Sequence, residues 1–308
     1  MMEKFARSMR LMGNNFTITV VTSDAEQADR FIDAGVSEIQ RIERLLTTYQ
    51  PDSQTNRINA NAGLAPVEVD REVFDLIARS IAISSITQGA FDITYGGIDR
   101  SLWNFDREMV TLPTKETAAK MVHLIDYRNI ELDAERCTVF LKKAGMRIGF
   151  GGIGKGYAAE RAKDILKRMG VTSGIINASG DLTAWGMQPD GRPWTIGIAH
   201  PDHPAASFSF MNISNQAVAT SGNYEKYVMI DGRKYSHTID PKTGLPVTGI
   251  KSVTIICDNA EFADAMATPI SVMGIEAGLF LANQIPGLYC IIIDDQNTLY
   301  TSKNIHLI

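Results

Sequence analysis

Residues 147–170 read RIGFGGIGKGYAAERAKDILKRMG and contain the densest group of glycines in the chain. The glycines share one eight-residue window and are Gly149, Gly151, Gly152, Gly154 and Gly156. After Lys155 the apolar residues recur at helical spacing and Gly170 supplies a stop, so the glycines lead into a predicted helix. Because unpaired N–H groups and the helix dipole favour negative charge, this turn indicates a phosphate-bearing ligand. Tight packing of a strand against a helix is the alternative interpretation.

The glycine pattern matches neither of the common nucleotide-binding motifs. A P-loop needs Ser or Thr directly after the Gly-Lys pair, whereas Gly156 and Tyr157 follow Lys155. The letters GFGGIG satisfy G-x-G-x-x-G in form, but no acidic residue about 20 positions on closes a predicted strand. Other segments of the chain therefore have to decide between ligand binding and packing.

The composition is that of a globular protein without a nucleic-acid-binding surface. The chain has 308 residues, of which 44% are hydrophobic and 21% charged, and its net charge is −5. Cys137, Cys257 and Cys290 lack metal-ligand spacing and are expected to be free and buried. Neither a signal-peptide pattern nor an uncharged run of membrane-spanning length is visible. As the sequence stands we expect a cytoplasmic protein, or a periplasmic protein or lipoprotein if a signal segment was removed.

Long helices and short strands follow one another irregularly along the chain. Apolar periodicity predicts helices over 25–46, 70–87 and 260–283, the third interrupted at Pro269 and Gly274. Alternating or apolar runs predict strands at 16–22, 139–141, 175–177, 195–199, 228–230, 252–256, 288–293 and 298–301. The polar residues 47–63 are expected to form a loop with short turns. Without regular strand–helix–strand repeats, this order favours an α+β fold over a doubly wound sheet.

The segment EFADAMATPISVMG holds a candidate metal site. Asp264 and Thr268 are four residues apart on a predicted helix, so their side chains share one face. Carboxylate and hydroxyl oxygens suit Mg²⁺, which completes its shell with waters and phosphate. The alternative is that Asp264 only favours the first turn of the helix through the dipole.

The segment RKYSHTIDPKTGLPV holds a candidate general base beside a tight turn. Asp240 begins the turn sequence DPKTG, and the flanking residues predict strand, turn, strand. His237 lies just before the turn. The alternatives are a structural role for this lone histidine and, for Asp240, hydrogen bonds to the turn backbone alone. The segment ATSGNYEKY offers hydroxyls but no nucleophile motif, and G-x-S-x-G is absent.

Taken together, these segments resemble the ApbE family of FAD:protein FMN transferases. The resemblance covers about Met12 to Gly274 and consists of eight segments in the same order, namely RLMGNNF, TTYQPDSQTNRIN, GAFDITYGGI with LWNF, GFGGIGKGYAAERA, NASGDLTAWG, ATSGNYEKY, SHTIDPKTGLPV and ADAMAT. It implies one ApbE-like domain over residues 1–308, with an α+β, T-fold-related architecture. In such a fold mixed sheets pack with long helices, and FAD binds in a cleft between lobes.

The resemblance also implies which residues form the site. The implied FAD contacts are Met12, Tyr49, Ala90, Phe91, Asp92, Lys155 and Ile239. The implied Mg²⁺ ligands are Asp264, Thr268 and the carbonyl oxygen of Gly152. One position departs from the family pattern, because Gly149 stands where relatives commonly carry an Asp that contacts FAD.

The residues and the resemblance together suggest a mechanism. Mg²⁺ acts as a Lewis acid on the FAD pyrophosphate, a Thr or Ser hydroxyl of an acceptor protein attacks the FMN-side phosphorus, and AMP leaves. His237 is the candidate general base, and Asp240 orients it or the substrate. Family acceptors are often subunits of membrane redox complexes. Two alternatives remain open: a Mg²⁺-dependent FAD pyrophosphatase that releases FMN and AMP, and a protein that binds FAD without catalysis.

Overall fold

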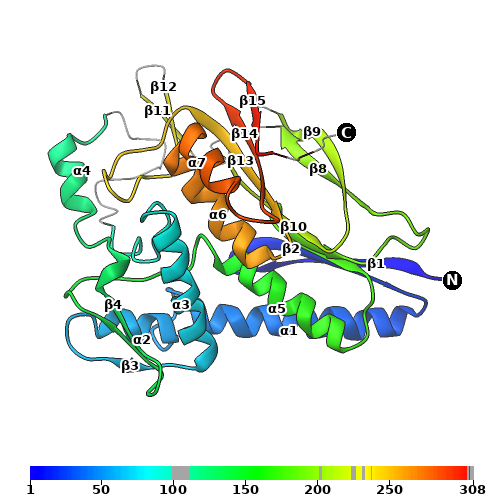
Figure 1. The fold of residues 1–308 in the computed structure, drawn as a ribbon. Coiled ribbons are helices and arrows are strands. Elements are labelled where there is room, and N and C mark those ends of the chain that lie inside the picture. The colour runs from blue at the N-terminus through cyan, green and yellow to red at the C-terminus, as the bar shows by residue number, and fades with distance from the viewer. Residues whose placement is uncertain are drawn as a thin grey trace.

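A central eight-stranded sheet organises the molecule (Figure 1). The computed structural model describes residues 1–98, 111–200, 203–222, 227–230, 233–236, 238–303 and 305. In spatial order the strands are β1 (Glu3–Leu11), β2 (Asn14–Thr22), β6 (Gly174–Ala178), β7 (Asp181–Trp185), β10 (Gln216–Gly222), β13 (Ile250–Cys257), β14 (Tyr289–Asp294) and β15 (Leu299–Thr301). All neighbouring pairs are antiparallel, so the sheet is not of the doubly wound type.

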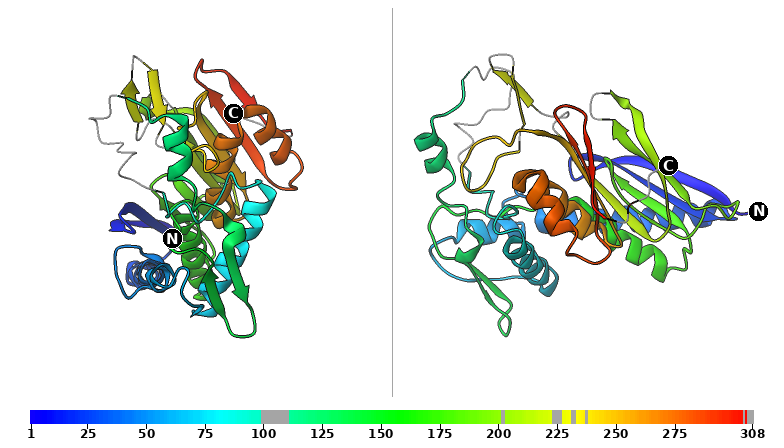
Figure 2. Two further views of the ribbon diagram at one scale, coloured as in Figure 1. Left: turned by 90° about the vertical axis from the view of Figure 1, so that its left-hand side faces the viewer. Right: turned by 45° about the horizontal axis from the view of Figure 1, so that its top comes forward.

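The two faces of this sheet are covered differently (Figure 2). Helices α1 (Ala25–Leu46), α5 (Gly154–Arg168) and α6 (Ala260–Met273) pack on one face and form the main core with it. The other face is covered by a hairpin of β8 (Trp194–His200) and β9 (His203–Ile213). Trp194 and Ile213 of this hairpin pack against sheet residues such as Leu182 in a second, smaller core. The mixture of helices and antiparallel sheet confirms the α+β prediction.

Helix α1 has the bounds that its apolar periodicity predicted. It begins after Asp24, whose carboxylate accepts a hydrogen bond from the N–H of Glu26 at 2.9 Å. Phe31, Ile39 and Ile42 are buried on its inner face, and burying each such side chain contributes about 1.5–3 kcal/mol. The amphipathic pattern alone was therefore enough to define this helix.

A second group of elements extends beyond the helix layer, at the left of Figure 1. Its helices are α2 (Gln54–Ala60), α3 (Arg71–Ile86), α4 (Lys115–Met121) and the short η1 (Tyr127–Asn129). Its three strands pair in the order β3 (Val67–Glu68), β5 (Thr138–Leu141), β4 (Ile130–Asp133). We call this group the α3 lobe. Its helix α2 corrects the prediction of a loop over residues 47–63, because the hydroxyl of Ser53 caps the N–H of Asn56 at 3.1 Å.

The third predicted helix is divided at one of its two predicted breaks. Gly274 has φ +86° and separates α6 from α7 (Ile275–Ala282), as predicted. Pro269 lies inside α6, so its prediction as a break was wrong. The fixed φ of proline is compatible with a helix, and the main loss is one backbone hydrogen bond.

Several strands carried no usable sequence signal. In β1 the charge of Arg7 interrupts the apolar face of Phe5, Met9 and Leu11, and such charges are typical of a strand at the edge of a sheet. The predicted strand after the DPKTG turn is reduced to one bridge between Ile239 and Pro246. Before that turn, β12 (Arg233–Ser236) pairs instead with β11 (Tyr227–Ile230) as a separate hairpin.

Helices α5 and α6 cross in close contact at Gly156. A Cβ at this position would lie 2.1 Å from the carbonyl oxygen of Ala260 and 2.7 Å from the Cβ of Asp264. No side chain fits at such distances, so Gly156 is required by packing. The packing interpretation of the glycine-rich segment is therefore correct at this glycine.

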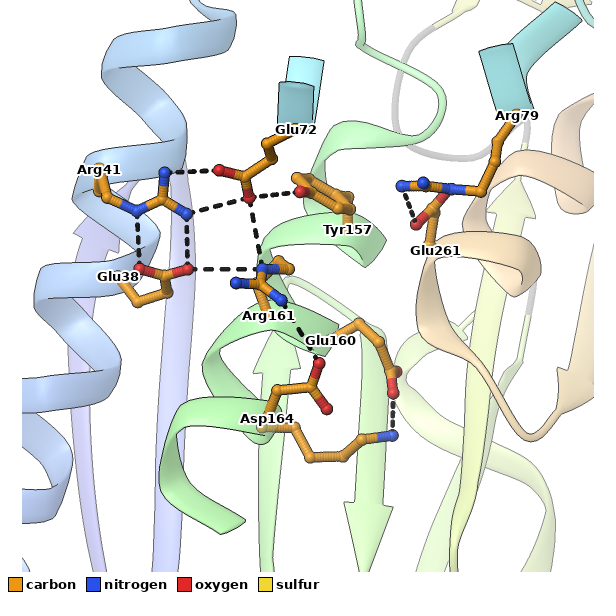
Figure 3. A network of polar contacts seen from close by, with 10 residues as sticks. Glu38, Arg41, Glu72, Arg79, Tyr157, Glu160, Arg161, Asp164 and Glu261 are labelled. Carbon is orange, nitrogen blue, oxygen red and sulfur yellow. Dashed lines mark hydrogen bonds and ion pairs between the residues drawn. The ribbon is translucent and has the colours of Figure 1, made fainter. Parts of the chain in front are cut away.

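An ion-pair network joins α1, α3 and α5 beside this crossing (Figure 3). The Arg41 guanidinium bonds Glu38 of its own helix at 2.7 Å and Glu72 of α3 at 2.6 Å. Tyr157 of α5 donates its hydroxyl hydrogen bond to Glu72, and Arg161 lies 3.3 Å from the same carboxylate. Glu72 thus fastens the α3 lobe to the helix layer.

A separate ion pair joins α3 to α6. Arg79 donates two hydrogen bonds to the carboxylate of Glu261, at 2.6 and 3.0 Å. The guanidinium also lies 5.7 Å from the centre of the Tyr157 ring. Because paired, planar hydrogen bonds fix orientation as well as distance, this contact sets the angle between α3 and α6.

We predict that Gly156→Ala destabilises the protein by about 3 kcal/mol, because the methyl group must separate α5 from α6. Gly151→Ala is the matched control, since no atom lies within 4 Å of a Cβ there. Urea unfolding monitored by circular dichroism should show a change within about 0.5 kcal/mol for the control. Equal stabilities of the two variants would contradict the close crossing.

We predict that Glu72→Gln costs about 1–3 kcal/mol near neutral pH, because Arg41 and Tyr157 lose a charged partner. Burial alone would raise the pKa of Glu72, but the hydrogen bonds from Arg41 and Tyr157 lower it below its ordinary value of 4.5. The stabilisation is therefore complete above pH 4.5 and is lost as the pH falls through the lowered pKa.

Urea unfolding at several pH values measures this difference. The difference between wild type and Glu72→Gln should shrink in acid, while Glu135→Gln, at an exposed position, should differ little from wild type throughout. A difference that does not change with pH would show that Glu72 acts through packing and not through charge.

Candidate active site

The glycine-rich loop before α5 gathers side chains from distant parts of the chain. A Cβ added to Gly152 would lie 3.7 Å from the ring of Phe91, and one added to Gly154 would lie 3.7 Å from the terminal methyl group of Met12. A Cβ on Gly149 would meet only the methyl of Thr48, at 3.9 Å. Three segments expected to contact FAD thus approach this loop.

Gly149 and Gly151 border open space on the same loop. The N–H of Gly149 donates to the carbonyl of Ile93 at 2.9 Å, which holds the loop against the segment after α3. Gly151 is exposed and has no neighbour within 4 Å of a Cβ position. The loop therefore has a free side on which a ligand can approach the backbone, and a side chain at position 149 would fit there.

The N-terminus of α5 is occupied by a carboxylate of the protein itself. Ile153 is the N-cap residue and provides no side-chain hydrogen bond. Asp264 of α6 instead accepts hydrogen bonds from the backbone N–H groups of Lys155 and Gly156, the latter at 2.9 Å. The predicted anion site thus exists, but its anion is Asp264 and not a phosphate bound directly by the helix end.

Asp264 lies in an electrostatic setting that favours a cation. It is 7% exposed, and burial together with the nearby charge of Asp181 raises the pKa of its carboxyl group to about 7. Lys155 acts in the opposite direction but compensates only part of this effect. A divalent cation would stabilise both carboxylates, so the residues present fit a magnesium site.

Thr268 lies one turn further along α6 and is partly exposed. Its hydroxyl can therefore face the same site as Asp264, as the spacing predicted. Within the described part of the chain there is no group of three or more His, Cys, Asp or Glu residues arranged for a metal. A cation here would thus need oxygens from Thr268, the backbone, water or substrate, and the Gly152 carbonyl stays a prediction.

The structure adds Asp181 to the residues that sequence reasoning identified. This residue begins β7, is 5% exposed and forms an ion pair with Lys155. Its other oxygen accepts a hydrogen bond from the N–H of Thr220 at 3.0 Å. The sequence did contain a signal for this contact. Asp181 and Thr220 lie in the segments NASGDLTAWG and ATSGNYEKY, which carry the family resemblance but contain none of the predicted site residues.

The implied flavin contacts near the N-terminus differ in exposure. Met12 has φ +50° and packs against the core, and its carbonyl accepts a hydrogen bond from the Asn14 side chain at 2.8 Å. Tyr49 is 91% exposed, next to Thr48 at the glycine-rich loop. An aromatic ring this exposed is available to stack on a planar ligand.

Asp92 is fully engaged in holding its own segment. One oxygen accepts hydrogen bonds from the N–H and hydroxyl of Thr94, at 2.8 and 2.6 Å, and the other from the N–H of Tyr127 at 2.8 Å. Burial raises the pKa of its carboxyl group, although these hydrogen bonds oppose the shift. Ala90 and Phe91 are buried just before it. Contact of all three residues with FAD stays a prediction.

The DPKTG segment forms a turn that packs on the α3 lobe. Asp240 accepts hydrogen bonds from the N–H of Lys242 at 2.8 Å and the hydroxyl of Thr243 at 3.1 Å, so it serves the turn. Ile239 is 3% exposed and packs with Ile98. Their roles in catalysis and in FAD binding stay predictions. His237 lies outside the described residues.

A cavity of about 800 Å³ lies between α3, α5 and α6. Its lining includes Glu72, Arg79, Tyr157 and Arg161, which are labelled in Figure 3, and none of the expected site residues. A cleft that holds FAD between the lobes stays a prediction from the resemblance. Among the described residues, no helix is both long and apolar enough to cross a bilayer.

Comparisons with known proteins place the chain in a family. The sequence model of the ApbE family matches residues 12–292, and the chain belongs to this family. A protein named FAD:protein FMN transferase from Klebsiella pneumoniae (strain 342) is 31% identical over 302 residues, covering 97% of this chain and 90% of that protein. One of the same name from Treponema pallidum (strain Nichols) is 32% identical over 273 residues, covering 83% and 74%.

Solved structures show the same fold. The crystal structure of the ApbE protein from Thermotoga maritima has a TM-score of 0.88 and 30% identity, covering 98% of this chain and 97% of that chain. The apo form of the flavinyl transferase ApbE from Pseudomonas stutzeri has a TM-score of 0.85 and 29% identity, covering 98% and 95%. The predicted ApbE-like architecture is therefore confirmed.

We predict that the metal-free protein loses stability as the pH rises. Because the pKa of Asp264 is raised from 3.8 to about 7, the folded state binds more protons than the unfolded state between these values. The unfolding free energy should fall there by at most about 1.4 kcal/mol per pH unit.

Urea unfolding in EDTA between about pH 5 and about pH 8 measures this slope. Asp264→Asn should flatten it and should be the more stable protein at the upper end, because the amide is never charged. Asp29→Asn, at an exposed position of α1, should keep the wild-type slope. An unchanged slope in Asp264→Asn would assign the pH dependence to another group.

Proposed function

We propose that this protein is an FAD:protein FMN transferase, which cleaves the FAD pyrophosphate and joins FMN to a Thr or Ser hydroxyl of an acceptor protein. Membership of the ApbE family and relatives of that name over most of the chain support the proposal. The observation that carries it is the buried Asp264 at the N-terminus of α5, beside Asp181, Lys155 and the open glycine-rich loop.

The cation expected in this site is Mg²⁺, held by Asp264, Thr268 and the carbonyl of Gly152. When bound, it would supply Lewis-acid polarisation of the pyrophosphate oxygens. Lys155 has its ammonium at the same site and would bind the pyrophosphate through charge. Gly151 leaves room for a phosphate to approach the backbone. Because Asp264 already caps α5, the phosphates would interact with Lys155 and the loop, not with the helix end.

The flavin portion would be bound by segments that meet at the loop. Met12 and Phe91 lie against Gly154 and Gly152, and the exposed ring of Tyr49 is free to stack on the ligand. The buried hydrogen bonds of Asp92 would hold Phe91 in place. Ala90 and Ile239 complete the proposed flavin contacts.

In the transfer step the acceptor oxygen bonds to the FMN phosphorus as the bond to the bridging oxygen breaks. The bridging oxygen leaves with AMP, and the hydroxyl proton passes to a base. His237 is our candidate for that base, since an imidazole titrates near neutral pH. Asp240 accepts hydrogen bonds within the DPKTG turn that follows, and its proposed role is to orient His237 or the substrate.

We predict that Asp264→Ala abolishes transfer, because the cation loses its charged ligand. The purified protein is incubated with FAD and Mg²⁺, with and without an acceptor domain that carries a Thr or Ser flavinylation motif, and followed by mass spectrometry. Wild type should add one FMN to the acceptor and release AMP, and EDTA should block both products. Asp29→Ala, at an exposed position, should retain activity.

Two outcomes would contradict this proposal. If AMP and free FMN form while the acceptor stays unmodified, the protein is an FAD pyrophosphatase. If FAD is bound and stays intact, the protein carries flavin without turnover. Normal transfer by Asp264→Ala would instead remove Asp264 from the metal site.

A further inference from the structure

We propose that Asp181 is a positioning residue that holds the Lys155 ammonium away from Asp264 and so keeps the Asp264 carboxylate available to a divalent cation. The inference rests on the proposed function and extends it to the assembly of the metal site. Asp181 comes from the segment NASGDLTAWG, to which neither sequence reasoning nor the resemblance gave a role.

Both oxygens of the Asp181 carboxylate are engaged. Oδ2 forms the ion pair with Lys155 Nζ, and Oδ1 accepts a hydrogen bond from the N–H of Thr220 at 3.0 Å. Asp181 lies on β7 and Thr220 on the neighbouring β10, so the carboxylate is attached to the central sheet. The Lys155 side chain is the more flexible partner of this ion pair, because its charge lies at the end of four methylene groups.

Lys155 and Asp264 are direct neighbours. The backbone N–H of Lys155 donates to the Asp264 carboxylate, and the Lys155 charge acts on the same carboxylate. Without the charge of Asp181, the ammonium would be attracted to Asp264, the other carboxylate on which its charge acts. An ion pair between them would occupy an oxygen that a cation needs as its ligand.

Asp181 also contributes to the charge of the site. Two buried carboxylates and one ammonium leave a net negative charge for a divalent cation. Asp181→Asn removes this net charge, whereas Lys155→Met doubles it. The double variant Asp181→Asn/Lys155→Met restores the wild-type sum with neutral groups. The net charge and the competition for Asp264 therefore lead to the same predictions. Cation binding should weaken in Asp181→Asn, tighten in Lys155→Met and recover in the double variant.

Mn²⁺ binding to the full-length chain tests the predicted ranking of the variants' cation affinities, without FAD or acceptor. Free Mn²⁺ is measured by electron paramagnetic resonance during a titration, with Mg²⁺ as competitor. Asp181→Asn should weaken Mn²⁺ binding about tenfold, as for other groups that support a metal ligand. Lys155→Met should bind more tightly than wild type, and the double variant should return close to wild type.

Asp190→Asn is the matched control, because Asp190 forms an ion pair with Arg192 in an exposed turn. It should leave Mn²⁺ affinity unchanged. Thermal unfolding and circular dichroism identify any variant that does not fold. If Asp181→Asn is unfolded, the affinity of Lys155→Met still decides the question.

Three results would overturn the proposal. They are an unchanged affinity in folded Asp181→Asn, a weaker affinity in Lys155→Met, and a double variant that binds no better than Asp181→Asn. The third would mean that Asp181 only supports the local fold. Absence of FMN transfer in wild type would refute the proposed function but not the predicted ranking of Mn²⁺ affinities, so the two failures are distinguishable.

Discussion

The contact between Asp264 and the N-terminus of α5 is the interaction on which the site depends. It requires Gly156, because only a residue without Cβ lets α6 bring a carboxylate to the N–H groups of Lys155 and Gly156. The same contact buries Asp264 beside Asp181, where a divalent cation would stabilise both carboxylates. Packing and electrostatics are therefore set by one helix crossing.

The α3 lobe is fastened close to that crossing. Arg79 of α3 bonds Glu261, which precedes Asp264 by one turn of α6. Glu72, nearer the start of α3, is held by Arg41 and Tyr157 (Figure 3). Because α3 leads into the segment that carries Phe91, these polar contacts position the proposed flavin contacts relative to the proposed metal ligands. Partly buried ion pairs suit this purpose, since they specify orientation where apolar contacts alone would allow sliding.

Lys155 and Asp181 show how a site can be built from segments that are individually weak signals. Lys155 comes from the glycine-rich segment, Asp181 from a strand start, and Thr220 from the neighbouring strand. Each alone is an ordinary polar residue. Their shared position at one end of the central sheet, beside α6, makes them a unit with defined charge. The chemistry proposed for the family thus depends on the sheet order as much as on the residues.

The sequence by itself determined the local features: the full extent of α1, the start of α5, the break at Gly274 and the pairing of Asp264 with Thr268 on one helix. Those features depend on periodicity, capping and backbone preference within a few residues. Only the tertiary structure decided that the anion at α5 is Asp264, that the N–H of Tyr127 engages Asp92, and that Asp181 belongs to the site. These outcomes depend on contacts between residues 26 to 108 positions apart, and the physical reason is that no local pattern records which distant group will neutralise a buried charge.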